Sequence, residues 1–151
     1  MLKKGDQAPE FSLLNQNGEK VTLSELLKAG AVVLFFYPKA MTTGCTKESC
    51  HFRDLAAEFS EVQAQRVGIS ADTVDKQAAF DNKHNLGYPL LSDPDRSVAT
   101  AFGVKRPGPI MNKRATFVIG TDQKILAVIG SELNMDVHAD EALTVLRSAA
   151  V

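Results

Sequence analysis

Apolar residues along the chain fall into short groups separated by polar segments, and their spacing predicts a regular succession of strands and helices. The longest apolar run, residues 31–37 (AVVLFFY), is too short to span a bilayer and is typical of a buried strand. Shorter runs predict further strands, and apolar residues recurring every three or four positions predict helices. The expected strands are Val32–Tyr37, Arg66–Ser70, Pro89–Leu91, Thr116–Ile119 and Ile125–Ile129, and the expected helices include Thr73–His84, Val98–Phe102 and Ala139–Ser148.

Two apolar segments near the N-terminus predict a β-hairpin. Phe11–Leu14 and Val21–Leu23 flank an Asn-Gly pair at residues 17–18, a dipeptide that favours tight turns between strands. A short helix is expected to follow, with Ser24 as its cap and its leucines facing inward.

Both cysteines lie in the segment CTKESC, residues 45–50, which opens the longest expected helix. This helix is predicted to run from Cys45 to about Val62, and the glycine and threonines before it are typical of a helix start. Its expected buried face consists of Phe52, Leu55, Ala56 and Phe59.

Strands alternating with helices, closed by an antiparallel pair around Asp122, indicate an α/β fold with a central mixed sheet covered by helices on both faces. The length of 151 residues and the apolar content of 44% suit one ordinary domain, residues 1–151. Residues 105–113 (KRPGPIMNK) carry two prolines and a glycine and are expected to form a loop.

The charge balance narrows the possible partners. The chain has 17 basic and 18 acidic residues and a net charge of -1, so nucleic acid and anionic membranes are not expected partners. No apolar stretch follows the lysines at positions 3 and 4, so neither a secretory signal nor an anchor is expected and a cytoplasmic location is predicted. In that reducing compartment, two cysteines favour metal or redox chemistry over a permanent cross-link.

The spacing of the cysteines restricts their chemistry. On an intact helix, Cys45 and Cys50 would point about 140° apart, with Cα atoms roughly 8–9 Å apart. This exceeds the ~7 Å limit for a disulfide without backbone movement. Cys45 is expected within about 20° of the core direction, and Cys50 roughly 160° away from it.

Zinc is not expected at these cysteines, because Cys45, Cys50 and His51 would fan around the helix and no second cysteine pair completes a site. The two-residue spacing of a thioredoxin-type exchanger is also absent. Cys45 lies in the first turn, where free backbone N–H groups and the helix dipole favour the thiolate. All three histidines, His51, His84 and His138, are expected at the surface.

The segment FFYPKAMTTGCTKESCHFRD, residues 35–54, resembles the active-site segment of peroxiredoxins, specifically the peroxiredoxin Q or bacterioferritin comigratory protein branch. The signature of that branch is proline, three residues, threonine, two residues and cysteine, and it falls on Pro38, Thr42 and Cys45. The second cysteine of the branch falls on Cys50. Residues 3–26, 88–104 and 114–126 also resemble segments of the family, so nearly the whole chain is covered.

This resemblance implies a thioredoxin-like fold with an N-terminal β-hairpin and the activity of a thiol peroxidase. It implies that Cys45 attacks a hydroperoxide and becomes a sulfenic acid, and that Cys50 resolves it as an intramolecular disulfide. The first turns of the helix would have to unwind for this step. A thioredoxin-type dithiol would then restore the thiols, with Cys50 as the expected point of attack because it faces away from the core. No cofactor or metal is implied.

The resemblance also assigns the family's active-site arginine to Arg114, in the sequence RATFVI. Its guanidinium would stabilise the thiolate and the charge that develops as the O–O bond breaks. The hydroxyl of Thr42 would orient the peroxide or hold the thiolate, and Pro38 would fix a loop that shields the sulfur. The roles of Glu48 and Arg53 stay open between two alternatives: a supporting ion pair, with each other or with Arg114, and a solvated helix face.

The chain departs from the branch between Pro38 and Cys45. Acidic residues and a second proline are common there, whereas this chain has Ala40, Met41 and Thr43. The more apolar pocket mouth leads to the hypothesis that organic hydroperoxides are preferred over hydrogen peroxide.

Two other functions stay open at this point. The oxidised, unwound helix would suit a redox sensor or adaptor that presents a surface to a partner protein. A general disulfide exchanger without peroxidase activity fits less well, because the two-residue cysteine spacing and tryptophan are both missing. A monomer or a weak homodimer is expected.

Overall fold

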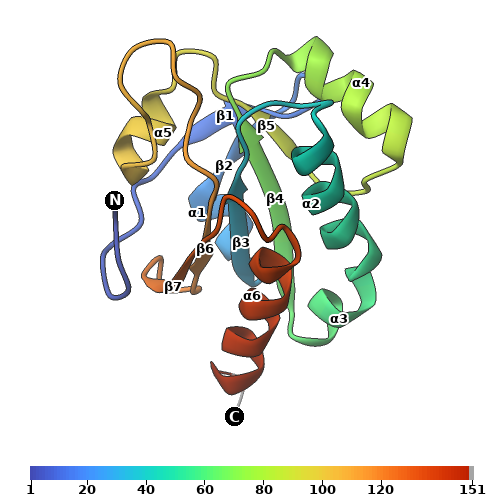
Figure 1. Cartoon of the computed structure of the whole chain (residues 1–151). Coiled ribbons are helices and arrows are strands. Elements are labelled where there is room, and N and C mark those ends of the chain that lie inside the picture. Colours follow the sequence, from blue (N-terminus) through green and yellow to red (C-terminus); the bar gives the residue numbers. More distant parts are fainter. Residues whose placement is uncertain (150–151) are drawn as a thin grey trace.

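The computed structural model describes residues 1–149, so the last two residues of the expected domain lie outside the described part. A seven-stranded mixed sheet in the order β2-β1-β5-β4-β3-β6-β7 forms the centre, with helices on both faces (Figure 1). The strands are β1 (Ser12–Leu14), β2 (Lys20–Thr22), β3 (Ala31–Phe36), β4 (Ala64–Ser70), β5 (Leu90–Ser92), β6 (Ala115–Ile119) and β7 (Ile125–Gly130). The helices are α1 (Leu23–Leu27), α2 (Thr43–Asp54), α3 (Ala56–Glu61), α4 (Val74–His84), α5 (Ser97–Phe102) and α6 (Asp136–Ala149).

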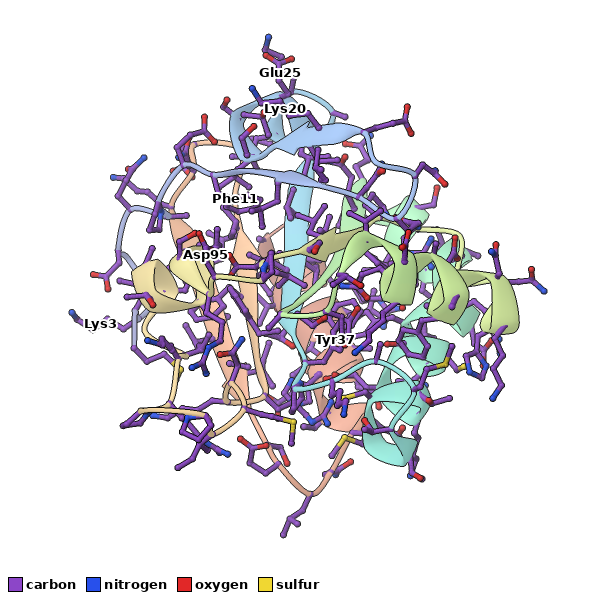
Figure 2. The ribbon with its side chains drawn as sticks, turned by 90° about the horizontal axis from the view of Figure 1, so that it is seen from above. Lys3, Phe11, Lys20, Glu25, Tyr37 and Asp95 are labelled. Carbon is purple, nitrogen blue, oxygen red and sulfur yellow. The ribbon has the colours of Figure 1, made fainter. Side chains whose placement is uncertain are left out.

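The apolar run of β3 is unbroken because both faces of this central strand are buried. Val32, Leu34 and Phe36 pack on the side of α1 and α5, whereas the residues between them pack on the side of α2, α3, α4 and α6. Side chains therefore fill the space on both sides of the sheet, and the charged side chains of Lys20 and Glu25 point outward at its edge (Figure 2).

The strand pairing confirms the predicted α/β class. β3, β4 and β5 are parallel, whereas β6, β7 and the hairpin β1–β2 add antiparallel pairs. Within residues 1–149, no helix is long and apolar enough to cross a membrane.

The prediction of one helix from Cys45 to Val62 is wrong in its extent. The helix begins two residues earlier, at Thr43, and Leu55 interrupts it with φ -97° and ψ 21°, which separates α2 from α3. Ala56, expected on the buried face, is exposed. The rings of Phe52 and Phe59, on either side of this break, both reach the core, where their centroids lie 5.7 Å apart.

The start of α1 also differs from the prediction. Thr22 occupies the N-cap position instead of Ser24, without a capping bond from its side chain. The second strand of the hairpin therefore leads directly into the helix, and Leu23 is already buried as its first residue.

Candidate active site

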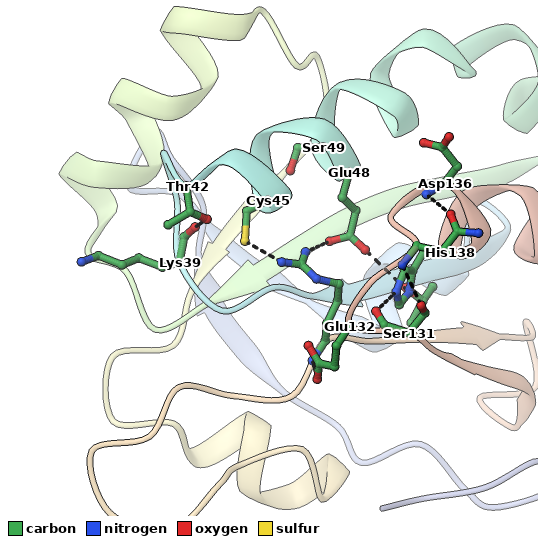
Figure 3. Close-up of polar contacts among 12 residues, drawn as sticks. Lys39, Thr42, Cys45, Glu48, Ser49, Ser131, Glu132, Asp136 and His138 are labelled. Atoms are coloured by element: carbon green, nitrogen blue, oxygen red, sulfur yellow. Dashed lines mark hydrogen bonds and ion pairs between the residues drawn. The ribbon is translucent and has the colours of Figure 1, made fainter.

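Cys45 lies in the first turn of α2, and its thiol is fully buried. The Nη2 group of Arg114 donates a hydrogen bond to its sulfur over 3.2 Å (Figure 3). The thiol thus lies at a helix N-terminus beside a permanent positive charge, in a site shielded from solvent.

Strand pairing carries Arg114 to this position. Ala115, the first residue of β6, pairs with Phe36 at the end of β3, and the chain runs from there through residues 37–42 into α2. Arg114 is 7% exposed, and its backbone N–H donates to the carboxylate of Glu132 over 3.1 Å. The resemblance placed Arg114 just before a strand and beside Cys45, and the structure brings the two together.

Gly44 allows the close approach of the arginine. A Cβ atom at this position would lie 3.3 Å from Nη2 of Arg114 and 3.5 Å from the sulfur of Met135. Any side chain at Gly44 would therefore crowd the guanidinium that contacts Cys45.

Glu48 is a buried site residue whose role the sequence left open. Its carboxylate accepts a hydrogen bond from Nη1 of Arg114 over 2.6 Å, and its side chain is fully buried. Burial raises the pKa of Glu48 to about 7, although the positive charge of Arg114 opposes this shift. One guanidinium thus serves two acidic groups, the Cys45 thiol and the Glu48 carboxyl.

Arg53 does not take part in this ion pair. It lies outside the site, where it contacts the carboxylate of Asp54 at 2.9 Å and donates to the backbone carbonyl of His84 over 2.7 Å.

The expectation that His138 lies at the surface is wrong. It is fully buried in the first turn of α6, where Nε2 contacts the carbonyl of Ser131 at 2.9 Å and Nδ1 contacts the hydroxyl of Thr116 at 2.8 Å. Nδ1 also lies 3.6 Å from Oε2 of Glu48. Burial lowers the pKa of His138, the carbonyl of Ser131 opposes this, and the charge of Arg114 adds to it.

A sequence signal for this burial existed. Ala142 and Leu146 follow His138 at intervals of four residues and are both buried, so the three side chains share one face of α6.

The other two histidines are only partly buried. His51 joins α2 to α6 through a 2.8 Å contact with Asp140, and its side chain is 27% exposed. His84 lies with its ring edge against Phe80. Among residues 1–149, no three His, Cys, Asp or Glu side chains gather in a way that would hold a metal ion.

Pro38 and Thr42 lie in the loop between β3 and α2. The hydroxyl of Thr42 is exposed and donates to the carbonyl of Lys39 over 2.8 Å, so its lone pairs remain available at the N-terminus of α2. The carboxylate of Asp72 accepts the N–H of Ala40 over 2.8 Å and anchors the middle of the loop. Sequence reasoning did not identify Asp72 as a support for this loop.

Cys50 lies further along α2, and both cysteines are free. It is half-buried and packs partly against the core on the α2 side of the sheet, so the expectation that it faces directly away from the core is only partly met. The helix is continuous across both cysteines. Cys50 is nevertheless the more accessible of the two thiols.

The backbone next to Cys50 is held by side chains from outside α2. The hydroxyl of Tyr88 donates to the carbonyl of Ser49 over 2.7 Å, and Nη1 of Arg66 donates to the carbonyl of Phe52 over 2.9 Å. These bonds fix the second half of the helix but not its first turn.

A buried thiol beside an arginine, with a second thiol five residues later on the same helix, defines a thiol-dependent oxidoreductase. The chain belongs to the AhpC/TSA family, whose model matches residues 4–128, and is therefore a peroxiredoxin, a peroxidase that works through thiols. It is 59% identical over 150 residues to a putative peroxiredoxin of Mycobacterium tuberculosis, with 97% of each chain covered. It is 39% identical over 155 residues to peroxiredoxin Bcp of Escherichia coli, with 99% of this chain and 98% of the other covered.

Solved structures agree with this family. Peroxidoxin BcpB of Mycobacterium tuberculosis superposes with a TM-score of 0.95 at 57% identity and covers 98% of each chain. Peroxiredoxin Q of Xanthomonas campestris gives a TM-score of 0.86 at 28% identity, over 93% of this chain and 92% of the other. The predicted thioredoxin-like fold and the predicted family are therefore confirmed.

Proposed function

We propose that the protein reduces hydroperoxides with Cys45 as the attacking nucleophile and Cys50 as the resolving thiol, and that a thioredoxin-type dithiol recycles it in the cytoplasm. The observation that carries the proposal is the 3.2 Å contact between Arg114 and the buried sulfur of Cys45. A buried thiol in contact with a fixed positive charge is poised to react as a thiolate.

In the first step, the Cys45 thiolate attacks one peroxide oxygen, and the electron pair of the O–O bond leaves with the other oxygen. Cys45 is oxidised to a sulfenic acid, and the leaving oxygen takes a proton to become water or an alcohol. Arg114 stabilises the negative charge that develops on the leaving oxygen. Thr42, at the N-cap of α2, orients the peroxide. Pro38 and the anchored loop exclude water from the sulfur.

In the second step, the thiol of Cys50 attacks the sulfenic sulfur, a disulfide forms and water leaves. The intact helix keeps the thiols too far apart, so the first turns of α2 must unwind. Tyr88 and Arg66 hold carbonyls of the second half, which confines the unwinding to the residues around Cys45.

In the third step, a dithiol donor attacks the disulfide by thiol–disulfide exchange and restores both cysteines. We assign Cys50 as the attacked sulfur, because it is the more accessible of the two in the folded helix.

The preference for organic hydroperoxides remains part of this proposal. Met41, Ile110 and Met111 are exposed apolar residues on the segments that lead to Thr42 and to Arg114. A bacterioferritin comigratory protein of Xanthomonas campestris, 28% identical, has been described for its alkyl peroxide reduction activity. Equal second-order rate constants for cumene hydroperoxide and hydrogen peroxide would contradict the preference.

Two serine variants test the roles of the cysteines. Cys45→Ser is expected to abolish peroxide consumption, and Cys50→Ser to reduce one equivalent of peroxide per chain but to lose turnover with thioredoxin. Peroxide loss is followed by stopped flow with titrated thioredoxin. Full activity in Cys45→Ser would overturn the assignment of the nucleophile, and full turnover in Cys50→Ser would overturn the resolving step.

A further inference from the structure

Behind the arginine, a line of buried polar groups crosses from α2 to α6. It runs from Cys45 through Arg114 to Glu48 and ends at His138 (Figure 3). All four side chains are buried, and the last of them has no assigned part in the proposed reaction.

The guanidinium of Arg114 has few fixed contacts. Nη1 is bound by Glu48 and Nη2 by Cys45, while the buried Nε makes no hydrogen bond within residues 1–149. When Cys45 is oxidised and its contact with Nη2 changes, the orientation of the guanidinium therefore depends on Glu48.

One of the two carboxylate oxygens of Glu48 is hydrogen-bonded. Its Oε1 accepts from Arg114, but its buried Oε2 has no hydrogen-bond partner in the described part of the chain. Nδ1 of His138 lies 3.6 Å from this oxygen. That distance is too long for a hydrogen bond, so the contact is electrostatic.

The bonds of His138 define its tautomer. The carbonyl of Ser131 can only accept, so Nε2 carries the proton, and in the neutral ring Nδ1 then accepts from the hydroxyl of Thr116. The ring is fixed from β6 and from the loop before α6, and its unprotonated nitrogen faces the side of Glu48.

We propose that His138 is a positioning residue for the peroxide reaction: it places a fixed imidazole nitrogen beside Oε2 of Glu48 and thereby holds the Arg114 fork against the sulfur of Cys45. The inference rests on the proposed function, because it gives Arg114 the role stated there.

Charge balance supports this role. A thiolate at Cys45, the cation of Arg114 and an ionised Glu48 would leave one net negative charge in a buried site, which is costly. One proton on Glu48 or His138 would restore neutrality, and burial, which raises the pKa of Glu48 and lowers the pKa of His138, favours Glu48 over His138 as its site. The other charges that act on His138 are Arg114, which directly precedes β6, Glu132 in the loop before α6, and Glu141 on α6 itself.

Two amide variants separate positioning from simple packing. His138→Asn keeps a polar atom near the place of Nδ1 and loses the contact with Ser131. His138→Gln keeps a donor for Ser131 and loses the nitrogen beside Glu48. His84→Gln is the matched control, because its ring lies against Phe80 on α4.

The measurement is the single-turnover rate constant of Cys45 with cumene hydroperoxide between about pH 5 and pH 9, a range that spans the ordinary histidine and buried carboxyl values. We expect a rate about tenfold lower for His138→Gln, with its pH inflection moved, and His138→Asn within about threefold of the parent. Equal losses in both variants with the pH profile of the parent would show a merely structural role and overturn the inference.

If neither variant folds, a measurement on the parent protein still tests the inference. Nitrogen-15 NMR of the histidine rings is expected to find His138 neutral with its proton on Nε2 at neutral pH, and a ring with its proton on Nδ1 would overturn the inference. A different result would show that the proposed function is wrong: Cys45→Ser would consume peroxide at the rate of the parent protein.

Discussion

Nη2 of Arg114 lies 3.2 Å from the sulfur of Cys45, although 69 residues separate the two positions in the sequence. The other arm of the same guanidinium is bound by Glu48. A planar fork presents separate nitrogens to the two groups in fixed directions, whereas the ammonium group of a lysine presents one nitrogen with rotatable donors. The two contacts as they are observed therefore require an arginine and not merely a positive charge.

Arg114→Lys tests this requirement. We expect the rate of peroxide attack by Cys45 to fall about 10- to 1000-fold, because the variant loses one of two directed donors in a buried site. The second-order rate constant measured by stopped flow checks it. Arg147→Lys, at the exposed end of α6, is the control, and a rate within twofold of the parent for Arg114→Lys would contradict the argument.

Much of the fold follows from short-range patterns in the sequence. The unbroken apolar run of β3 predicted a buried strand, and the spacing of Phe52 and Phe59 predicted a helix against the core. The break at Leu55 was missed, because the backbone angles of one residue have no signature in apolar spacing.

The site residues could be predicted only where the resemblance to peroxiredoxins assigned them. The resemblance brought Cys45 and Arg114 together and left Arg114 open as a partner of Glu48. It gave no role to His138, and the buried neighbours of His138 at four-residue intervals on α6 were overlooked. Polar side chains are also ordinarily exposed, so sequence reasoning placed His138 at the surface.

Glu48→Gln is expected to change how stability depends on pH. The folded chain binds a proton at Glu48 with a pKa of about 7, against an ordinary value of 4.5, so the unfolded chain releases that proton first. The parent therefore loses stability relative to Glu48→Gln as pH rises from about 4.5 to about 7, by on the order of 3 kcal/mol.

Thermal or urea unfolding of both proteins from about pH 4.5 to pH 8 measures this difference. The lowered pKa of His138 acts in the opposite direction, because it removes stability as pH falls below its ordinary value of 6.5. A difference that does not change with pH would contradict the assigned burial of Glu48.

Tyr88→Phe is expected to let the unwinding of α2 extend from its first turns to Cys50. It removes the hydroxyl that binds the carbonyl of Ser49 over 2.7 Å, a bond that contributes about 0.5–1.5 kcal/mol. Disulfide formation after oxidation should become several-fold faster, and less Cys45 should be overoxidised at high peroxide.

Chemical quench with mass spectrometry gives the rate of disulfide formation in Tyr88→Phe. The control is Tyr37→Phe, which removes the other tyrosine hydroxyl, bound to Gln77. A resolving rate equal to that of the parent would show that Tyr88 does not restrain the helix.

Asp72→Ala is expected to loosen the loop before α2. Its carboxylate accepts the N–H of Ala40 over 2.8 Å and the hydroxyl of Ser70 over 2.7 Å, so its removal leaves two buried donors unpaired. The free energy of unfolding should fall by about 1–3 kcal/mol and the peroxide rate should fall with it. Urea unfolding checks the first effect against Asp75→Ala, an exposed residue of α4, and equal stabilities would contradict it.

The most direct test treats the reduced chain with one equivalent of cumene hydroperoxide and then combines peptide mapping with hydrogen exchange. We expect a peptide in which Cys45 and Cys50 are joined and two hydrogens are lost, together with faster amide exchange over the first turns of α2. A Cys45 oxidised to an acid beside a free Cys50, or a linked pair within a helix that stays fully protected, would contradict it.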